Sequence, residues 1–407
     1  MRKFICLLLL SFVMFSCGIS EVNGSHPVDN QGNIWGGPLQ GTGPEGGGLV
    51  PVCYMTAVDY LKDYDWRADQ AKETIRCSLV VYADGSPIMK VPVGADCNVS
   101  SDPDMHRIVS GHLYTDYPSH GETIIKKDGT LLFSYPGEER IVGMHVRDAD
   151  VYTLGENRSG EGFSFRKNGE TIVLREKGTL LGRLNHDGDS LSFAFYDEIR
   201  NVDGNNRRYY SVYGNKVSQI ALREDLLSVW DVFRERDDII YVASLAGISQ
   251  PVIVAGKEMF ALDMPKGTSM TSCTLFKSGE KIGVEGVCRT ITGARFGGIW
   301  LNGERLAIFP NLTVSALCTD DYGVYCALNP QDVSSPGKIY RAGEIFDMPP
   351  GYGCMSSHSL TVTAGIMQVG LSSLKGKKPL VWKDGQIDSV RVNGYISMLY
   401  ADASDAL

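Results

Sequence analysis

The sequence lacks the signatures of the common hydrolases, metalloproteases and nucleotide-binding enzymes. It contains no Gly-x-Ser-x-Gly, no His-Glu-x-x-His and no Gly-x-x-x-x-Gly-Lys. It also contains no Cys-x-x-Cys pair, so zinc ribbons and thioredoxin chemistry have no support. After residue 17, no apolar run is long enough to span a bilayer as a helix. We therefore expect no cofactor and no metal, and we assign no catalytic residue.

Positive charge is scarce as well. The chain has 39 Lys and Arg against 48 Asp and Glu, which gives a formal net charge of −9. The basic residues form no run, so the chain lacks the electrostatic footprint of a nucleic-acid-binding protein. Hydrophobic residues make up 43% of the sequence and glycine occurs 46 times, which suits a packed core with many turns.

The only strongly apolar stretch lies at the amino end. Arg2 and Lys3 precede the apolar residues 5–15, and the stretch ends at Ser16-Cys17. It resembles a bacterial lipobox, although Met14 stands where leucine is usual. We predict that residues 1–16 are a lipoprotein signal peptide, that Cys17 is lipidated, and that residues 17–50 are a Gly-rich tether. The alternative is an ordinary signal peptide with an incidental cysteine.

This targeting segment predicts a lipid-anchored protein of the cell envelope. We expect the outer membrane, with either the periplasmic or the surface side as its location. Removal of residues 1–16 would take the formal charge from −9 to −11.

A short turn signal ending in glycine recurs eight times along the rest of the chain, at intervals of 40 to 47 residues. The glycines are Gly85, Gly129, Gly169, Gly214, Gly256, Gly303, Gly343 and Gly385. An apolar residue precedes each glycine by four positions, and five of the glycines follow Asp or Asn. Asx-Gly pairs favour two-residue hairpin turns of the primed types. A period near 43 residues with β-type sequence predicts the blades of a β-propeller.

The two ends of the repeat region complement each other. Residues 141–174 can be divided into four antiparallel strands, which is one complete blade. The first unit, in contrast, lacks a first strand, and residues 395–400 form a surplus strand after the last unit. We predict an all-β fold: a single propeller over residues 51–407 with eight four-stranded blades, or seven as the alternative. The carboxyl-terminal strand would close the ring by pairing near residues 53–58 of the first blade.

Two segments carry a family resemblance. Asp150-Val151-Tyr152 is followed by Phe165–Gly169, and Val381–Gly385 reads Val-Trp-Lys-Asp-Gly. These segments resemble the "DVYV…WKNG" repeats of lipid-anchored propeller proteins from Bacteroidota-type bacteria. The resemblance implies a propeller held at the envelope. It implies no activity, because the members of that group are mostly uncharacterised.

Long loops on one face of the propeller are the predicted recognition surface. We expect them at residues 59–74, 197–208 and 290–297, where aromatic residues stand beside arginines. The candidate ligand-binding residues are Tyr64, Trp66, Arg67, Arg207, Tyr209 and Arg295. Such side chains can stack on sugar rings or bind carboxylates. Alternatively, they cover neighbouring loops.

The remaining predictions concern the cysteines and the function. Cys318 and Cys326 flank a turn and are a candidate disulfide, with two buried thiols as the alternative. The favoured function is a non-catalytic binding module for a glycan, a peptide or a partner protein. A polysaccharide lyase or hydrolase acting at the central channel, and a scaffold subunit of an envelope complex, are the alternatives.

Overall fold

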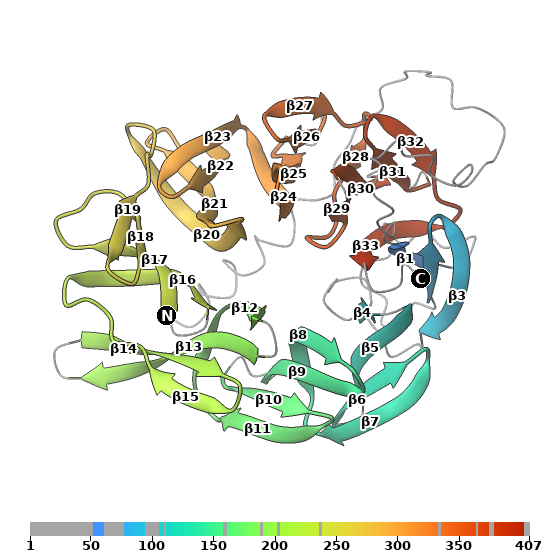
Figure 1. The fold of residues 1–407 in the computed structure, drawn as a ribbon, viewed down its shortest axis with the longest axis horizontal. Helices are drawn as coiled ribbons and strands as arrows, with labels where there is room; N and C mark the ends of the chain where they lie inside the picture. Colours follow the sequence, from blue (N-terminus) through green and yellow to red (C-terminus); the bar gives the residue numbers. More distant parts are fainter. Residues whose placement is uncertain are drawn as a thin grey trace, which may run out of the picture.

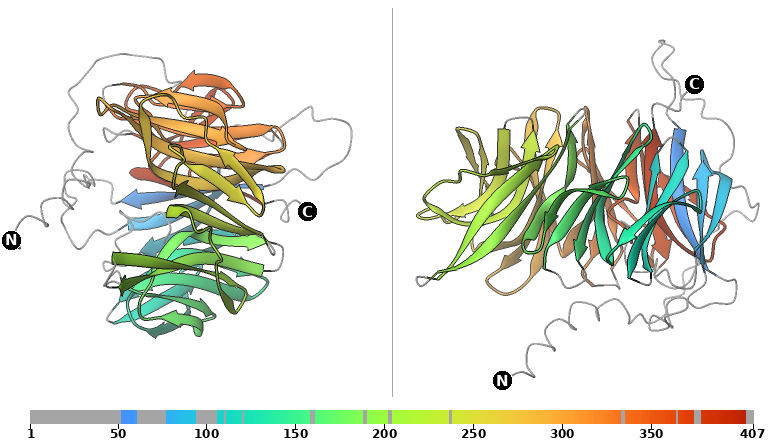
Figure 2. Two further views of the ribbon diagram at one scale, coloured as in Figure 1. Left: turned by 90° about the vertical axis from the view of Figure 1, so that its left-hand side faces the viewer. Right: turned by 90° about the horizontal axis from the view of Figure 1, so that it is seen from below.

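A computed structural model of the chain describes residues 52–60, 77–93, 106–109, 111–119, 121–157, 161–187, 190–201, 204–235, 238–332, 335–363, 365–373 and 378–402. This part of the chain forms 33 strands in eight antiparallel sheets. The sheets are arranged as the blades of a short ring around a central axis (Figures 1 and 2). None of the described residues forms a helix that is long and apolar enough to cross a membrane.

Each blade runs from an inner strand near the axis to an outer strand at the rim (Figure 1). Blade 1 comprises β33 (Gly394–Asp402), β1 (Val52–Tyr60), β2 (Cys77–Ala83) and β3 (Ser86–Val93). Blade 2 comprises β4 (His106–Val109), β5 (His112–Ser119), β6 (Glu122–Lys127) and β7 (Thr130–Pro136). Blade 3 comprises β8 (Glu139–Arg147), β9 (Asp150–Asn157), β10 (Phe163–Lys167) and β11 (Glu170–Arg175). Blade 4 comprises β12 (Thr179–Asp187), β13 (Ser190–Asn201), β14 (Gly204–Tyr213) and β15 (Lys216–Gln219).

The second half of the ring has the same plan. Blade 5 comprises β16 (Leu226–Glu235), β17 (Asp238–Leu245), β18 (Val252–Ala255) and β19 (Glu258–Ala261). Blade 6 comprises β20 (Thr268–Ser278), β21 (Lys281–Thr290), β22 (Arg295–Leu301) and β23 (Glu304–Pro310). Blade 7 comprises β24 (Leu312–Asp320), β25 (Gly323–Pro330), β26 (Lys338–Arg341) and β27 (Glu344–Asp347). Blade 8 comprises β28 (Tyr352–Gly353), β29 (Leu360–Thr363), β30 (Ile366–Ser373), β31 (Leu380–Lys383) and β32 (Gln386–Ser389).

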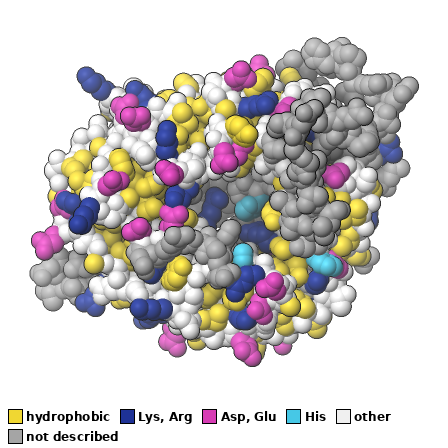
Figure 3. Space-filling model, in the orientation of Figure 1, with side chains coloured by type: hydrophobic (Ala, Val, Ile, Leu, Met, Phe, Trp, Pro, Cys, Tyr) yellow, Lys and Arg dark blue, Asp and Glu magenta, His cyan; other side chains and the backbone are white. Residues whose placement is uncertain are grey.

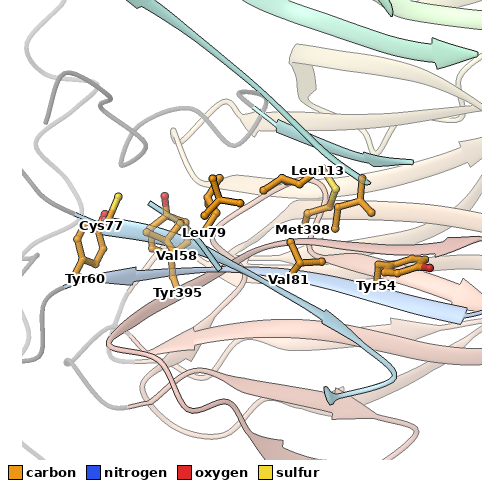
Figure 4. Packing of buried hydrophobic residues seen from close by; sticks show 11 residues of the cluster. Tyr54, Val58, Tyr60, Cys77, Leu79, Val81, Leu113, Tyr395 and Met398 are labelled. Atoms are coloured by element: carbon orange, nitrogen blue, oxygen red, sulfur yellow. The ribbon is translucent and has the colours of Figure 1, made fainter. Parts of the chain in front are cut away.

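The carboxyl-terminal strand closes the ring, as the sequence predicts. β33 pairs with β1 along its length, from Val52 opposite Asp402 to Asp59 opposite Gly394. Its side chains Tyr395 and Met398 pack among residues of β1 and β2 in one apolar cluster (Figure 4). Blade 1 is therefore built from both ends of the propeller, and the prediction of eight blades is confirmed.

The Asx-Gly turns explain why five of the eight units keep their register. At all five Asx-Gly pairs the Asx residue has a positive φ, between 44° and 51°, and the glycine that follows also has a positive φ. The side chain has a second role. In blade 3, Asn168 accepts a hydrogen bond from the Val151 backbone N–H at 2.8 Å through Oδ1. The Asx residues at the equivalent turns of blades 1, 2, 6 and 8 accept the same bond at 2.9 to 3.1 Å. Each of these turns is therefore fastened to the second strand of its own blade.

The inner strands carry a recurring irregularity. In blades 1, 3, 6 and 7, one extra residue of the inner strand interrupts its pairing with the next strand, and in blade 5 two residues, Leu227 and Trp230, do so. Such a bulge increases the local twist and redirects side chains. Two blades depart further from the pattern. In blade 4, residues 182–184 of β12 stand opposite the single residue Phe193, and in blade 8 residues 354–359 divide the inner strand into β28 and β29.

Candidate functional site

Three of the candidate ligand-binding residues lie outside the described residues. Tyr64, Trp66 and Arg67 all belong to the segment 61–76, and Cys17 precedes the first described residue. Their predicted roles therefore stay predictions.

The segment 197–208 is not the long loop that we expected. β13 continues to Asn201 and β14 starts at Gly204, so the two strands extend as one long hairpin. Opposite charges face each other along it, with Asp197 paired to Arg208 and Glu198 to Arg207. Such cross-strand pairs stabilise a hairpin. We expected a polar loop from the sequence and did not recognise these pairs.

The two candidates on this hairpin are engaged with their own neighbours. Arg207 lies over the ring of Tyr196, 4.5 Å from the ring centre, and forms an ion pair with Glu198 at 3.3 Å. Tyr209 is buried, with its ring 5.8 Å from that of Tyr196. Arg295 is exposed at the start of β22 in blade 6. The structure does not gather these three residues into one site.

The predicted disulfide is wrong. Cys318 stands opposite Tyr325 and Cys326 opposite Leu317, so the two thiols point to opposite faces of the β24–β25 hairpin. Both are free thiols, and each packs in a different apolar cluster. Burial raises the pKa of both thiols, which keeps them protonated at neutral pH.

A basic cavity lies at the inner strands instead. It has a volume of about 280 Å³. Arg107, His145, Arg183 and His358 line it, and each comes from a different blade. Figure 3 shows the centre of the ring as a hollow bordered by arginine or lysine and histidine side chains. In a chain with a net charge of −9, this is a local concentration of positive charge.

The enlarged bulge of β12 brings Arg183 to the cavity. Gly182 has a φ of +69°, a conformation that glycine adopts without strain. A side chain at this position would also be 2.5 Å from Asp231 Oδ1, so the backbone of blade 4 packs directly on blade 5. The Asn185 side chain donates to the Arg183 carbonyl at 3.1 Å, which holds the bulge in shape. Bulges that redirect a side chain are common beside functional sites.

The interruption of the inner strand of blade 8 brings His358 to the same cavity. The His358 N–H donates to Ser356 Oγ at 3.1 Å, and its carbonyl accepts from the Leu399 N–H of β33 at 2.8 Å. On the other side of the cavity, Arg107 donates to the His106 carbonyl at 2.9 Å. These bonds fix the backbone of His358 and the guanidinium of Arg107 before any ligand binds.

Two carboxyl groups lie near Arg183. Asp231 is buried, and its oxygens accept hydrogen bonds from the N–H groups of Val232 and Leu275 at 2.8 and 2.7 Å. Burial raises the pKa of Asp231 to about 6 and that of Glu285 to about 7, although the charge of Arg183 lowers both. Near neutral pH these acids are therefore partly protonated, and they neutralise Arg183 incompletely.

The lining of the cavity is suited to binding an anion. Two guanidinium groups supply charged donors for a carboxylate or phosphate, and two imidazoles add further polar groups. Within the described part of the chain, no cluster of three or more His, Cys, Asp or Glu residues is placed to hold a metal ion.

Sequence reasoning missed all four residues of this cavity. The one available signal was a break in the repeat at Gly182-Arg183; the interruption at residues 354–359 leaves the interval from Gly343 to Gly385 at an ordinary 42 residues. Neither break identifies a charge cluster, because the four residues meet only when the ring closes.

Comparisons with known proteins add little. The sequence matches no family model and no curated protein. Among solved structures, the β-propeller domain of the trilobed protease from Pyrococcus furiosus is similar with a TM-score of 0.41 and 10% identity, over 68% of this chain and 88% of that one. TolB from Acinetobacter baumannii is similar with a TM-score of 0.34 and 12% identity, over 86% of this chain and 82% of that one. A prolyl endopeptidase structure is similar with a TM-score of 0.41 and 10% identity, over 82% of this chain and 55% of that one. This chain therefore spans about half the length of the endopeptidase. At these values none of the three bears on what the chain does.

Proposed function

We propose that the chain is a lipid-anchored binding module of the cell envelope, with the basic cavity at the ring axis as its ligand site. The ligand is an anion, such as the carboxylate of an acidic glycan or of a peptide. The observation that supports this is the convergence of Arg107, His145, Arg183 and His358 from four blades on one cavity. Arginines far apart in sequence have no structural need to meet, and their mutual repulsion has to be offset by a binding partner or by nearby acids.

The local geometry favours binding over catalysis. Asp231, one of the two acids near Arg183 whose pKa is raised, already accepts two backbone N–H groups. Because both of its oxygens are held by these bonds, Asp231 is poorly placed to exchange a proton with a substrate. Turnover of an acidic polysaccharide would favour a lyase or hydrolase at the channel instead. A stable complex in envelope extracts would favour a scaffold subunit.

Loss of Arg183 is expected to weaken anion binding strongly. A hydrogen bond to a charged group contributes about 1.5–3 kcal/mol, so Arg183→Gln should lower the affinity for citrate by roughly tenfold to a hundredfold. Citrate is a suitable probe because it is a small, multivalent carboxylate, and isothermal titration calorimetry can measure its binding. The wild-type affinity should also decrease with salt and between pH 6 and pH 8, because Glu285 loses its proton and then offsets more of the charge of Arg183.

Arg223→Gln is the matched control. Arg223 is exposed and pairs with Asp225 at 2.9 Å, away from the cavity. Its removal should leave citrate affinity unchanged. Equal citrate binding by wild type and Arg183→Gln would contradict the assignment of the site.

Replacement of Cys17 is expected to release the protein from the membrane. The lipobox-like segment ends at Cys17, and acyl chains on that residue would provide the anchor. In cells fed a clickable palmitate analogue, the wild-type protein should be labelled and should sediment with membranes. Cys17→Ala should be unlabelled, whereas Cys6→Ala, within the predicted signal peptide, should behave as wild type. Labelled Cys17→Ala protein would show that the lipidation site is wrong.

A further inference from the structure

A second cavity lies between blades 3 and 4, and it has a different chemical character. It also has a volume of about 280 Å³, and its lining is mainly apolar. Tyr152 and Phe165 stack on one side with ring centres 6.2 Å apart, and Ile172 and Leu191 contribute aliphatic surface. The turn at Gly214 borders it. We call this cavity the interblade cleft.

A bulge in the outer strand directs Ile172 into the interblade cleft. Phe165 pairs with Val173 and Arg166 with Thr171, which leaves Ile172 as the extra residue of β11. The same bulge leaves Ile88, Leu132 and Leu306 unpaired in blades 1, 2 and 6. Those three side chains are 43% to 51% exposed, whereas Ile172 is half-buried. Blade 3 thus uses a repeated feature of the fold to line a cavity.

The interblade cleft and the basic cavity adjoin. His145 and Leu191 line both, so they form the boundary between the two spaces. Positive charge continues along the cleft through Arg147 and Lys167. Lys167 forms an ion pair with Asp150 at 2.7 Å, which offsets part of this charge. On the side of the basic cavity, Asp231 and Glu285 offset only part of the charge of Arg183.

We propose that the two cavities form one bipartite site for an amphipathic anion, which rests on the proposed function of the basic cavity. The anionic head lies with Arg107 and Arg183, and an apolar tail passes His145 and Leu191 into the interblade cleft. The ligand class is a medium-chain or aryl carboxylate. An oligosaccharide fits the cleft less well, because hydroxyl groups that face Phe165, Ile172 and Leu191 would lose water there without gaining hydrogen-bond partners.

Affinity should therefore depend on chain length. Each methylene buried in an apolar site adds about fourfold to an affinity. For the carboxylates from butyrate to decanoate, calorimetry should show affinity rising by about this factor per methylene until the cleft is filled, with one ligand bound per chain. Octanol, which has the tail without the charge, should bind much more weakly than octanoate.

Two variants separate the head from the tail. Arg183→Gln should weaken all the carboxylates by a similar factor and should preserve the chain-length dependence. Ile172→Trp, which fills the interblade cleft, should remove the chain-length dependence and leave citrate affinity unchanged. Leu132→Trp is the matched control, since it occupies the same bulge position on blade 2 and lines neither cavity. If Ile172→Trp does not fold, Asn215→Trp at the exposed rim of the cleft replaces it.

The possible failures are distinct. Citrate binding that depends on Arg183, without any gain from chain length, would overturn the bipartite site and leave the proposed function standing. Chain-length dependence without citrate binding, or two ligands bound per chain, would show that the interblade cleft takes apolar tails by itself, and this also overturns the bipartite site. A gain with chain length that persists in Ile172→Trp would place the tail elsewhere.

Discussion

Truncation of the chain after Asn393 is expected to abolish cooperative folding. The deletion removes β33, whose side chains Tyr395, Ile396, Met398 and Leu399 are all at least 94% buried. Burial of each such side chain contributes about 1.5–3 kcal/mol, so the loss approaches the whole stability of about 5–15 kcal/mol that is typical of proteins. Circular dichroism during heating should show no sigmoidal transition for the truncated chain.

The position of β33 makes the loss larger than that of an ordinary edge strand. Ser397 Oγ lies 3.1 Å from both the Thr56 carbonyl oxygen and His106 Nε2, so β33 links blade 1 to blade 2. The Leu399 N–H links it to the carbonyl of His358 in blade 8. Without β33 the ring opens at one point, and β1 is left with unpaired backbone groups that promote aggregation.

Two further variants make the test specific. Truncation after Asp402 removes only residues beyond the described strands, and it should melt as the full chain does. Ile396→Ala should fold but lose about 2–5 kcal/mol, because it creates a cavity at a fully buried position. If the chain that ends at Asn393 melted within a few degrees of the full chain, closure by β33 would not be what stabilises the ring.

The fold could be predicted from the sequence because its determinants are local and repeated. An Asx-Gly pair fixes a turn through the backbone conformation it allows. Eight turns that end in glycine, five of them Asx-Gly, recur at intervals of 40 to 47 residues and mark eight blades. The bond from Asn168 Oδ1 to the Val151 N–H could not be predicted, since it joins a turn to a strand 17 residues away. The same holds for the extended hairpin of blade 4, whose stability depends on cross-strand charge pairs such as Glu198 with Arg207.

The candidate site could not be predicted because it depends on contacts between distant blades. Arg107 and His358 are far apart in sequence and become neighbours only through ring closure by β33. Aromatic and arginine residues in polar segments pointed instead to Arg207 and Tyr209, which both contact Tyr196 of their own hairpin. Irregularities in the inner strands, at 182–184 and 354–359, were a better guide than residue type, because a repeat protein has no structural reason to break its repeat.

The free energy of unfolding is expected to decrease by about 4 kcal/mol between pH 5 and pH 8 because of two acids near Arg183. Burial raises the pKa of Asp231 from 3.8 to about 6 and that of Glu285 from 4.5 to about 7. A carboxyl group with a raised pKa binds its proton more tightly in the folded state than in the unfolded state. Its stabilising effect is complete below the unfolded pKa and is lost as the pH rises through the folded pKa.

Exposed acids do not obscure this window. Asp150 and Asp225 have pKa values that are lowered by Lys167 and Arg223, so they titrate below the ordinary aspartate range. Their effect on stability has the opposite sign and belongs to more acidic solutions. Histidines do titrate between pH 5 and pH 8, so the comparison has to be made between variants and wild type at each pH.

Glu285→Gln should remove most of the pH dependence. The amide cannot ionise, so the variant should be more stable than wild type by about 3 kcal/mol at pH 8 and by about 1 kcal/mol at pH 5. Asp231→Asn should behave differently, because its amide nitrogen cannot accept a hydrogen bond. It leaves the N–H of either Val232 or Leu275 without its acceptor, which costs about 1–3 kcal/mol at every pH.

Urea unfolding at pH 5, 6, 7 and 8 measures both variants, with the exposed Glu258→Gln as the control that should match wild type throughout. If Glu285→Gln kept the full wild-type slope, the buried carboxyl groups near Arg183 would not be the source of the pH dependence.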